Sequence, residues 1–397
     1  MITLDAARAL LLAGVAPLSD EQVAIGASAG RVLAKDVVAG FDQPAERRSA
    51  MDGYAVTAAD AVAGAILKVI GEAYAGAPFA GAVGRGEAVR IATGGVVPQG
   101  ADFVVMQEIA RREDDAVTID GPVHEAHFVR PAGGDFGAGE RLVEAGVVLG
   151  AARIGLIAAA SVASVSVRRR PRIAIFASGD ELREPGALLG PGEVADSASV
   201  ALAVLVEQWG GIAERRPTLP DELARATALI GEARGADLIV LVGGASVGDR
   251  DVLRGAVTGL GATILFDRIA VQPGKPSWHA RFGDGGLLIG LPGNPASAFV
   301  CAHLLIEPMI AAMLGRAAAR RVVARLAGDL PAGSQRETWW RARVEVDDEG
   351  QMIATPDPRR DSSLQRPLAS ANALLRQPAD GAAMAAGATV ELLLIGA

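Results

Sequence analysis

The stretch from Arg172 to Pro308 alternates short apolar runs with segments of helical periodicity, and this alternation limits the possible folds more than any other feature. Residues 172–177 and 237–242 are apolar almost throughout, as expected for strands buried on both faces of a sheet. One helix face is indicated at Leu202, Leu205, Val206 and Trp209. Strands that alternate with helices in this way indicate a parallel α/β sheet covered on both faces.

More elements of the same kind follow along this stretch. Further strands are predicted at 262–269 and 285–290, and a long helix from about Pro295 to Leu314. Asp196 or Ser197 is suited to cap the helix after the first strand, because a short polar side chain there can accept a hydrogen bond from a free backbone N–H group.

The sequence pattern changes on either side of the α/β stretch. Residues 41–135 contain short β runs separated by glycines and lack helical periodicity, which predicts a small β module. Residues 1–40 and 136–167 are mixed and are predicted to form one domain, whereas 316–397 return to β character and are predicted to form a small barrel-like domain. With an α/β domain at 168–315, we expect four domains, which suits a chain of 397 residues.

Composition excludes several classes of function. The net charge of -8 argues against a nucleic-acid-binding protein, which would carry a basic face. Cys301 is the only cysteine, so no intramolecular disulfide can form. His124 and His127 are three residues apart, but no further Cys or His lies nearby in the sequence to complete a zinc site. The N-terminus lacks a basic region, and no uncharged apolar run reaches about 18 residues. We therefore expect a soluble cytoplasmic protein that binds no membrane.

Four unusual loops follow predicted strands of the α/β stretch. They are Ser178–Glu181, Gly243–Asp251, Gln272–Pro276 and Leu291–Pro295. In a parallel α/β sheet, ligands bind outside the carboxyl ends of the strands. Glycines let the backbone approach a phosphate, free N–H groups at a helix start bind anions, and carboxylates can hold Mg²⁺ against phosphate oxygens. The loops together predict a pocket for a phosphorylated ligand.

Each loop also has a purely structural interpretation. Gly243-Gly244 after a strand is commonly a tight turn, and Lys275 between prolines is commonly a solvated side chain. Asp180-Glu181 suits the start of a helix, where the dipole favours acids. Four such loops at successive strand ends of one domain favour the ligand pocket over a coincidence of turns.

These loops resemble those of the MoeA family, the molybdopterin molybdenumtransferases, which include the E domain of gephyrin-type proteins. The resemblance covers the whole chain in order and is therefore specific. Outside the strand-end loops it is carried by Met51-Asp52-Gly53-Tyr54-Ala55, Arg90-Ile91-Ala92-Thr93-Gly94-Gly95, Pro98-Gln99-Gly100-Ala101-Asp102, Met106-Gln107-Glu108, Gly133-Gly134-Asp135 and Gly139-Glu140.

The resemblance implies both an activity and an architecture. Adenylyl-molybdopterin would be the substrate and molybdate the co-substrate, and with Mg²⁺ the enzyme would form molybdenum cofactor and release AMP. The fold would combine a central MogA-like parallel α/β domain, a β-rich lid module and a C-terminal β-barrel domain. A homodimer is implied, with the cleft between the third domain of one subunit and the second domain of its partner. A MogA-like adenylyltransferase and molybdoenzyme apoproteins are the protein partners that this family suggests.

The resemblance also assigns roles to residues. Catalytic roles fall to Asp52, Glu181 and Asp251, of which Glu181 and Asp251 would hold the metal ion. The molybdate site would consist of Lys275, Ser297, Arg336 and Ser362, which offer cations and hydroxyl donors to an oxyanion. The substrate-binding residues would be Thr93, Asp135, Ser178, Gly179, Asp180, Asp196, Ser197, Gly243, Gly244, Ser246, Gly248, Pro273, Gly274, Pro276, Pro292, Gly293 and Asn294.

The chain departs from the family pattern at three places. Ala198 stands where an asparagine is usual, Gln272 where a lysine is usual, and Arg359-Arg360-Asp361-Ser362 where the family has Gln-Gly-Ser. Ala198 and Gln272 favour an alternative, a molybdopterin-binding scaffold that has lost turnover. A second alternative is the preceding adenylylation of molybdopterin by the α/β domain, although the three additional domains count against it.

Overall fold

The computed structural model describes residues 1–123, 127–244 and 252–395. Three predicted site residues, Ser246, Gly248 and Asp251, lie outside the described residues. The chain divides into two compact units. The first comprises Met1–Glu21, Gly30–Ala34 and Ser166–Ala397, and the second comprises Gln22–Ala29 and Lys35–Val165. The four domain boundaries expected from the sequence stay a prediction.

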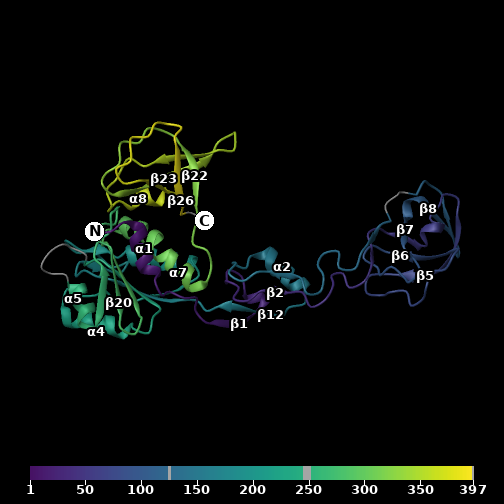
Figure 1. The fold of residues 1–397 in the computed structure, drawn as a ribbon, viewed down its shortest axis with the longest axis horizontal. Helices are drawn as coiled ribbons and strands as arrows, with labels where there is room; N and C mark the ends of the chain where they lie inside the picture. Colours follow the sequence, from purple (N-terminus) through teal and green to yellow (C-terminus); the bar gives the residue numbers. More distant parts are fainter. Residues whose placement is uncertain (124–126, 245–251, 396–397) are drawn as a thin grey trace. The chain divides into compact units, whose positions relative to one another are not determined.

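The first unit contains a six-stranded sheet in the order β16-β13-β17-β21-β20-β18. Figure 1 labels β20 of this sheet. Its strands are β13 (Arg172–Ala177), β16 (Ile212–Arg215), β17 (Leu238–Val242), β18 (Ala262–Phe266), β20 (Trp278–Phe282) and β21 (Leu287–Leu291). β16, β13, β17 and β21 pair in parallel. β20 pairs antiparallel with both of its neighbours, β21 and β18. The predicted parallel α/β class is confirmed, with one reversed strand inside it.

The reversed strand β20 was missed because His279 and Arg281 interrupt its apolar pattern. As the sequence suggested, the loop Gln272–Pro276 follows a strand of this sheet, β18, with the short strand β19 between them, and it leads into β20. Since β20 runs against β21, with Trp278 paired to Gly290, the start of β20 lies at the carboxyl end of β21. β18 also runs against β20, so its carboxyl end lies at the same edge. The loop therefore lies at the predicted ligand edge, between the end of β18 and the start of β20.

Helices cover both faces of the sheet, and the side chains of β13 alternate between them. Ala174 and Phe176 pack in the cluster on one face, and Ile173 and Ile175 in the cluster on the other. The first face is covered by α4 (Leu223–Glu232) and α5 (Val252–Gly259) (Figure 1). The second is covered by α1 (Leu4–Leu12), α3 (Ala198–Gln208) and a continuous helix made of α6 (Pro295–Cys301), a π-helical turn (Ala302–Ile306) and α7 (Glu307–Leu314).

The helix Pro295–Leu314 is the single one, over the described ranges, that is long and apolar enough to cross a membrane. The apolar stretch of this helix is 83% buried inside the unit. Burial of this kind is typical of a core helix, since both sheet and neighbouring helices supply apolar contacts.

A small β-barrel follows in the same unit. Its strands are β22 (Arg321–Leu326), β23 (Glu337–Val346), β24 (Met352–Pro356), β25 (Ala373–Gln377) and β26 (Thr389–Leu394), with the short helix α8 (Gln365–Ala369). Pairing of β23 with β25 closes the sheet into a ring, which confirms the predicted barrel. The short strand β19 (Val271–Gln272) comes from the α/β part and pairs in parallel with β23. It therefore ties the loop Gln272–Pro276 to the barrel.

The second unit contains a six-stranded sheet in the order β7-β4-β6-β5-β9-β8. Its strands are β4 (Gly53–Val56), β5 (Ile66–Ala73), β6 (Glu87–Ile91), β7 (Phe103–Met106), β8 (Ala110–Glu113) and β9 (Ala116–Ile119). The remaining elements of the chain are β1 (Asp20–Ala24), β2 (Val37–Val38), β3 (Arg48–Ser49), β10 (Val129–Arg130), β11 (Arg141–Val143), α2 (Ala151–Ala159), β12 (Ser164–Arg168), β14 (Leu182–Arg183), β15 (Val194–Ala195) and short 3₁₀ turns at Ile25–Ala27, Ala58–Asp60 and Gln107–Ile109.

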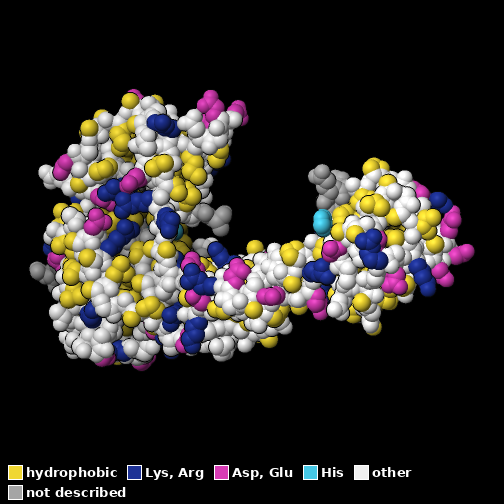
Figure 2. Space-filling model, turned by 45° about the vertical axis from the view of Figure 1, so that its right-hand side comes forward, with side chains coloured by type: hydrophobic (Ala, Val, Ile, Leu, Met, Phe, Trp, Pro, Cys, Tyr) yellow, Lys and Arg dark blue, Asp and Glu magenta, His cyan; other side chains and the backbone are white. Residues whose placement is uncertain are grey.

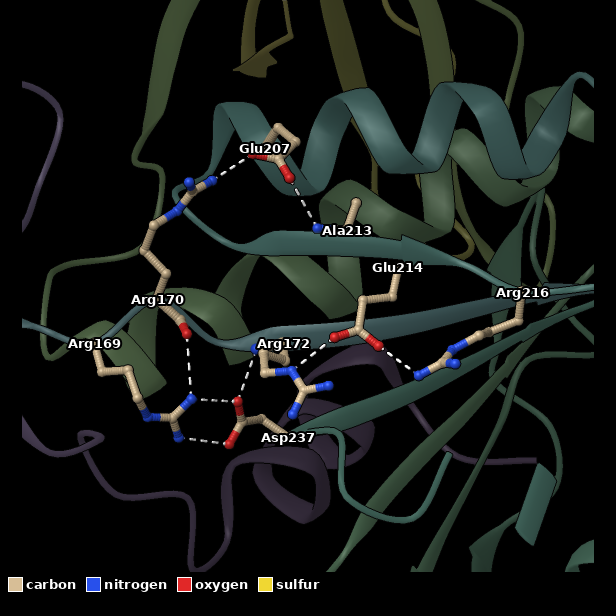
Figure 3. A network of polar contacts seen from close by, with 8 residues as sticks. All are labelled: Arg169, Arg170, Arg172, Glu207, Ala213, Glu214, Arg216 and Asp237. Atoms are coloured by element: carbon tan, nitrogen blue, oxygen red, sulfur yellow. Dashed lines mark hydrogen bonds and ion pairs between the residues drawn. The ribbon is translucent and has the colours of Figure 1, made fainter. Parts of the chain in front are cut away.

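The arginine run before β13 anchors the start of the α/β sheet (Figure 3). Arg169 donates to both carboxylate oxygens of Asp237, at 2.9 and 2.8 Å, and the backbone N–H of Arg172 donates to the same carboxylate at 2.7 Å. Burial alone would raise the pKa of Asp237, but these hydrogen bonds outweigh it and hold the pKa below its ordinary value. The carboxylate thus joins the segment before β13 to the start of β17.

Replacing Asp237 with Asn should lower the free energy of unfolding at pH 7 by about 2 kcal/mol, because the Arg169 guanidinium loses its bidentate anion. A carboxyl group with a depressed pKa in the folded state stabilises above its unfolded pKa, and this contribution disappears as pH falls through the folded pKa. The difference between native and variant should therefore shrink in acid.

Urea unfolding at pH 7 and at decreasing pH measures this effect. Glu345→Gln is the matched control, because Glu345 belongs to an exposed ion pair with Arg343 and should change stability by less than about 0.5 kcal/mol. An Asp237→Asn variant as stable as the native chain at pH 7 would contradict the assignment.

Candidate active site

Two adjoining cavities lie where the strand ends of the α/β sheet meet the barrel within the first unit. The larger, about 740 Å³, is called the strand-end cavity. It is lined by Ala177, Ser178, Glu181, Leu182, Val194, Ala195, Asp196, Ser197, Ala198, Val242, Gly243, Gly244, Pro276, Pro292, Gly293, Asn294, Pro295, Ser363 and Gln365. All four loops predicted to carry the phosphorylated ligand thus contribute to one cavity.

The smaller cavity, about 300 Å³, is called the barrel-side cavity. It is lined by Gln272, Pro273, Gly274, Lys275, Pro276, Pro292, Asn294, Ala296, Ser297, Val300, Arg336, Thr338, Trp339, Trp340, Arg341, Asp357, Arg359, Arg360 and Ser362. Pro276, Pro292 and Asn294 border both cavities. A ligand in one cavity would therefore lie next to a ligand in the other.

Bare backbone forms one wall of the strand-end cavity. Gly243 has φ +102°, and a Cβ atom added there would lie 2.6 Å from the carbonyl oxygen of Ser178. A Cβ atom on Gly293 would lie 3.3 Å from the Cα atom of Gly243. The loops after β13, β17 and β21 thus pack backbone against backbone. Such close packing requires glycine and leaves peptide groups accessible to an anion.

Glu181 is an exposed carboxylate on the wall of the strand-end cavity. Its side chain lies against Gly179, where an added Cβ atom would come within 2.5 Å of a Glu181 oxygen. Gly179 itself and Asp180 do not line either cavity, and the Asp180 carboxylate accepts a hydrogen bond from the Asp221 N–H group at 3.4 Å. Across the described ranges, no group of three His, Cys, Asp or Glu side chains could hold a metal ion.

Asp196 and Ser197 line the strand-end cavity but have different environments. Asp196 is 4% exposed and accepts from the Ser199 N–H group at 3.0 Å, which confirms its capping role at the start of α3. It also pairs with Arg215 at 3.5 Å, so its charge is already used within the protein. The Ser197 hydroxyl accepts from Gln365 of the barrel at 2.6 Å. Asp196 therefore shapes the cavity, whereas Ser197 joins it to the barrel.

All the residues predicted to bind molybdate line the barrel-side cavity: Lys275, Ser297, Arg336 and Ser362. Lys275 is exposed to it, and Ser297 lies in the first turn of α6. The Ser362 hydroxyl accepts from the Asn294 amide at 2.7 Å, a second link between the barrel and the strand-end loops. Two cations and two hydroxyls from four separate segments converge on this space.

Gln272 lies where the sequence comparison expects a lysine, and it contacts Arg336. The Gln272 side-chain oxygen accepts from the Arg336 guanidinium at 3.4 Å, and the Val271 carbonyl accepts from the same guanidinium at 3.5 Å. An amide here can orient Arg336, whereas a lysine would repel it. Compared with a lysine, Gln272 therefore removes one positive charge from the cavity but helps to hold the guanidinium of Arg336 in place.

Positive charge dominates the barrel-side cavity. Its described lining contains the cations Lys275, Arg336, Arg341, Arg359 and Arg360, against one carboxylate, Asp357. Figure 2 shows Lys and Arg side chains gathered where the barrel and the α/β sheet meet. The sequence analysis did not assign roles to Arg341, Arg359 or Arg360. The departure at Arg359-Arg360-Asp361, directly before Ser362, was the signal that could have identified two of them.

The second unit holds the other predicted site residues. Asp52 and Thr93 are exposed and adjacent, since the Asp52 carboxylate accepts from the Thr93 N–H group at 2.6 Å. Hydrogen bonds from Thr93, assisted by the charge of Arg90, lower the pKa of Asp52 below its ordinary value. Asp135 is exposed and is held through its backbone N–H group, which donates to the carbonyl of Gln43 at 2.9 Å.

Comparisons with known proteins cover almost the whole chain. Residues 2–161 match the MoeA N-terminal region (domain I and II), residues 174–312 a probable molybdopterin binding domain, and residues 323–395 the MoeA C-terminal region (domain IV).

Curated relatives and solved structures agree with these matches. The chain is 38% identical over 336 residues to a molybdopterin molybdenumtransferase of Nostoc sp., covering 80% of this chain and 76% of that one. It is 33% identical over 319 residues to one of Haemophilus influenzae, covering 80% and 78%. A crystal structure of a molybdopterin biosynthesis MoeA protein from Pyrococcus horikoshii matches 100% of both chains with a TM-score of 0.84 at 27% identity.

Proposed function

Because the chain belongs to the MoeA family of molybdopterin molybdenumtransferases, we propose that it inserts molybdenum from molybdate into adenylyl-molybdopterin and releases AMP. The observation that carries this proposal is the convergence of Lys275, Ser297, Arg336 and Ser362 on one cavity. That cavity adjoins a second one of about 740 Å³ with a glycine-lined wall.

The strand-end cavity takes the phosphate-containing part of the substrate in this proposal. Backbone N–H groups near Gly244 and Gly293 are suited to phosphate oxygens, because glycine allows close approach. The wall shared by both cavities, formed by Pro276, Pro292 and Asn294, would then place the dithiolene sulfurs beside the oxyanion. Positioning the two reactants side by side removes much of the entropic barrier to their reaction.

The barrel-side cavity takes molybdate. Lys275 and Arg336 supply positive charge, and the hydroxyls of Ser297 and Ser362 donate to its oxygens. During the reaction a water oxygen adds to the adenylyl phosphorus, the phosphoanhydride bond breaks, AMP leaves, and molybdopterin keeps its own phosphate. The two dithiolene sulfurs bind molybdenum as one Mo–O bond breaks, and that oxygen leaves as water with the two thiol protons. The protein's part is to hold the oxyanion against the sulfurs until this exchange is complete.

Mg²⁺ fits the strand-end cavity through Glu181. Mg²⁺ is commonly held by one or two carboxylates together with phosphate oxygens of the substrate, so a single exposed carboxylate beside glycine backbone is a suitable donor. The bound ion would supply charge neutralisation at the pyrophosphate. Asp251, the second expected ligand, lies outside the described residues.

We further propose a cytoplasmic homodimer in which Asp52 and Thr93 of one chain reach the cavities of its partner. Two features support this proposal. Both residues are exposed, and the Asp52 carboxylate, which is anionic at neutral pH like any ordinary aspartate, is already held by the Thr93 N–H group. An exposed anion with an organised hydrogen bond suits a role on a ligand outside its own unit.

The activity can be tested with the purified chain, adenylyl-molybdopterin, Mg²⁺ and molybdate. We expect molybdate-dependent release of AMP, measured by chromatography, and formation of cofactor that activates a molybdoenzyme apoprotein. Absence of both products would refute the proposal. Tight molybdopterin binding without AMP release would instead indicate a scaffold, and ATP consumption with unadenylylated molybdopterin would indicate an adenylyltransferase.

A further inference from the structure

The arginines around the barrel-side cavity differ in the partners that their guanidinium groups contact within the protein. Arg341 is 7% exposed, and its guanidinium donates to the carbonyl oxygens of Asp361 and Leu364 at 3.1 and 2.9 Å. Arg359 pairs with both carboxylate oxygens of Asp357, at 2.9 and 2.6 Å. These two arginines therefore organise the loop before Ser362, and the charge of Arg359 is neutralised there.

Arg360 is placed differently, on a rigid aromatic surface. Its guanidinium lies over the ring of Trp340 at 4.3 Å from the ring centroid. Trp340 is 7% exposed, and its indole N–H group donates to Gln377 at 3.0 Å. A guanidinium stacked on a fixed ring keeps its N–H edges available while its position is restricted.

The carboxylates nearest to Arg360 in sequence are engaged with other groups. Asp357 pairs with Arg359, and Asp361 accepts from the backbone N–H group and the hydroxyl of Ser363, both at 2.8 Å. Within the described part of the chain, Arg360 forms no ion pair. Arg360 is thus an exposed, positioned cation on the cavity wall without a counterion of its own.

We propose that Arg360 is a further anion-binding residue of the barrel-side cavity, where it supplies the positive charge that Gln272 does not. This inference rests on the proposed function of the barrel-side cavity. A tetrahedral dianion such as molybdate gains from more than one cation, and Lys275 and Arg360 line the same cavity from the α/β loop and the barrel loop respectively. Gln272 instead orients Arg336.

Binding of molybdate alone to the full-length protein tests this role without the pterin substrate. Equilibrium dialysis with elemental detection of molybdenum should give a Kd about tenfold higher for Arg360→Gln than for the native chain. Arg360→Lys, which keeps the charge, should recover most of the affinity. Arg366→Gln removes an exposed arginine of α8 that lines neither cavity, and it should bind molybdate like the native chain.

A double-mutant cycle with Gln272 separates this role from a general charge effect. Gln272→Lys should recover only a small part of the molybdate affinity in the Arg360→Gln background, because it restores the number of cations but places the new one beside Arg336. Full recovery would show that only the total charge of the cavity matters and would contradict a positioned role for Arg360. Native affinity in Arg360→Gln, or no molybdate binding by the native chain, would overturn the inference. AMP release is measured separately, so a chain that binds molybdate through Arg360 but releases no AMP would refute the proposed activity and leave this role intact.

Discussion

Lys275→Gln should lower the kcat/KM for molybdate in cofactor formation by about a hundredfold or more, because it removes a positive charge from the oxyanion cavity. Lys275 lies on a loop bounded by Pro273 and Pro276, which restrict the backbone on both sides. The loop is further tied to the barrel by β19, so a neighbouring side chain cannot easily take its place. The measurement is activation of a molybdoenzyme apoprotein at varied molybdate concentration.

The chain offers a matched control for this substitution. Lysine occurs at only three positions, and Lys68 is exposed on β5 of the second unit. Lys68→Gln removes the same charge and should leave cofactor formation unchanged. Lys275→Gln with native molybdate dependence would exclude Lys275 from the oxyanion site.

The same variant tests the proposed homodimer. Asp52→Asn should also lower activity strongly, since in the proposed dimer it removes the anion that one subunit offers to its partner. Mixed dimers of Lys275→Gln and Asp52→Asn would carry one intact site and should regain part of the native activity after co-expression. No recovery in mixed dimers would show that the two residues do not act across a subunit interface.

Gly290→Ala should destabilise the α/β sheet by about 3 kcal/mol, because the added methyl group overpacks a closed interior. A Cβ atom at Gly290 would lie 1.9 Å from the indole nitrogen of Trp278, its direct partner across β20 and β21. Trp278 is completely buried and among the largest buried side chains of the described residues. At an exposed strand position, alanine is ordinarily more stable than glycine. The predicted loss of stability on Gly290→Ala therefore depends on the clash with Trp278.

Urea unfolding measures the loss, and two comparisons isolate its cause. Gly283→Ala is the control, since an added Cβ atom there meets nothing within 4 Å, and it should change stability by less than about 0.5 kcal/mol. In a Trp278→Leu background the cost of Gly290→Ala should fall by at least about 2 kcal/mol, because the smaller side chain leaves room for the methyl group. An equal cost in both backgrounds would contradict the steric explanation.

The elements that the sequence predicted best are those whose signal is local. β13 and β17 are apolar on both faces, and helical spacing placed Leu202, Leu205 and Val206 correctly on the buried side of α3. The short strand β16 was missed because its Ile-Ala-Glu-Arg sequence at the sheet edge is half polar. Local patterning reports burial, so it fails where a strand is exposed.

The candidate site likewise contains residues that local motifs identify and one residue that they do not. Motif resemblance selected Lys275, Ser297, Arg336 and Ser362, and these side chains line one cavity. The motifs did not select Arg360. Its guanidinium is held at the cavity wall by stacking on the ring of Trp340, and the position of Trp340 depends on closure of the barrel, which no motif records.

The sequence alone determined the α/β class, the buried strands and the glycine- and proline-rich loops, because burial and backbone freedom leave a local pattern in residue type. Only the tertiary structure decided the direction of β20, which runs back from the ligand edge after Gln272–Pro276, and the pairing of β19 with the barrel. Strand direction and partner choice depend on hydrogen bonds between segments far apart in the chain, and no local period records them.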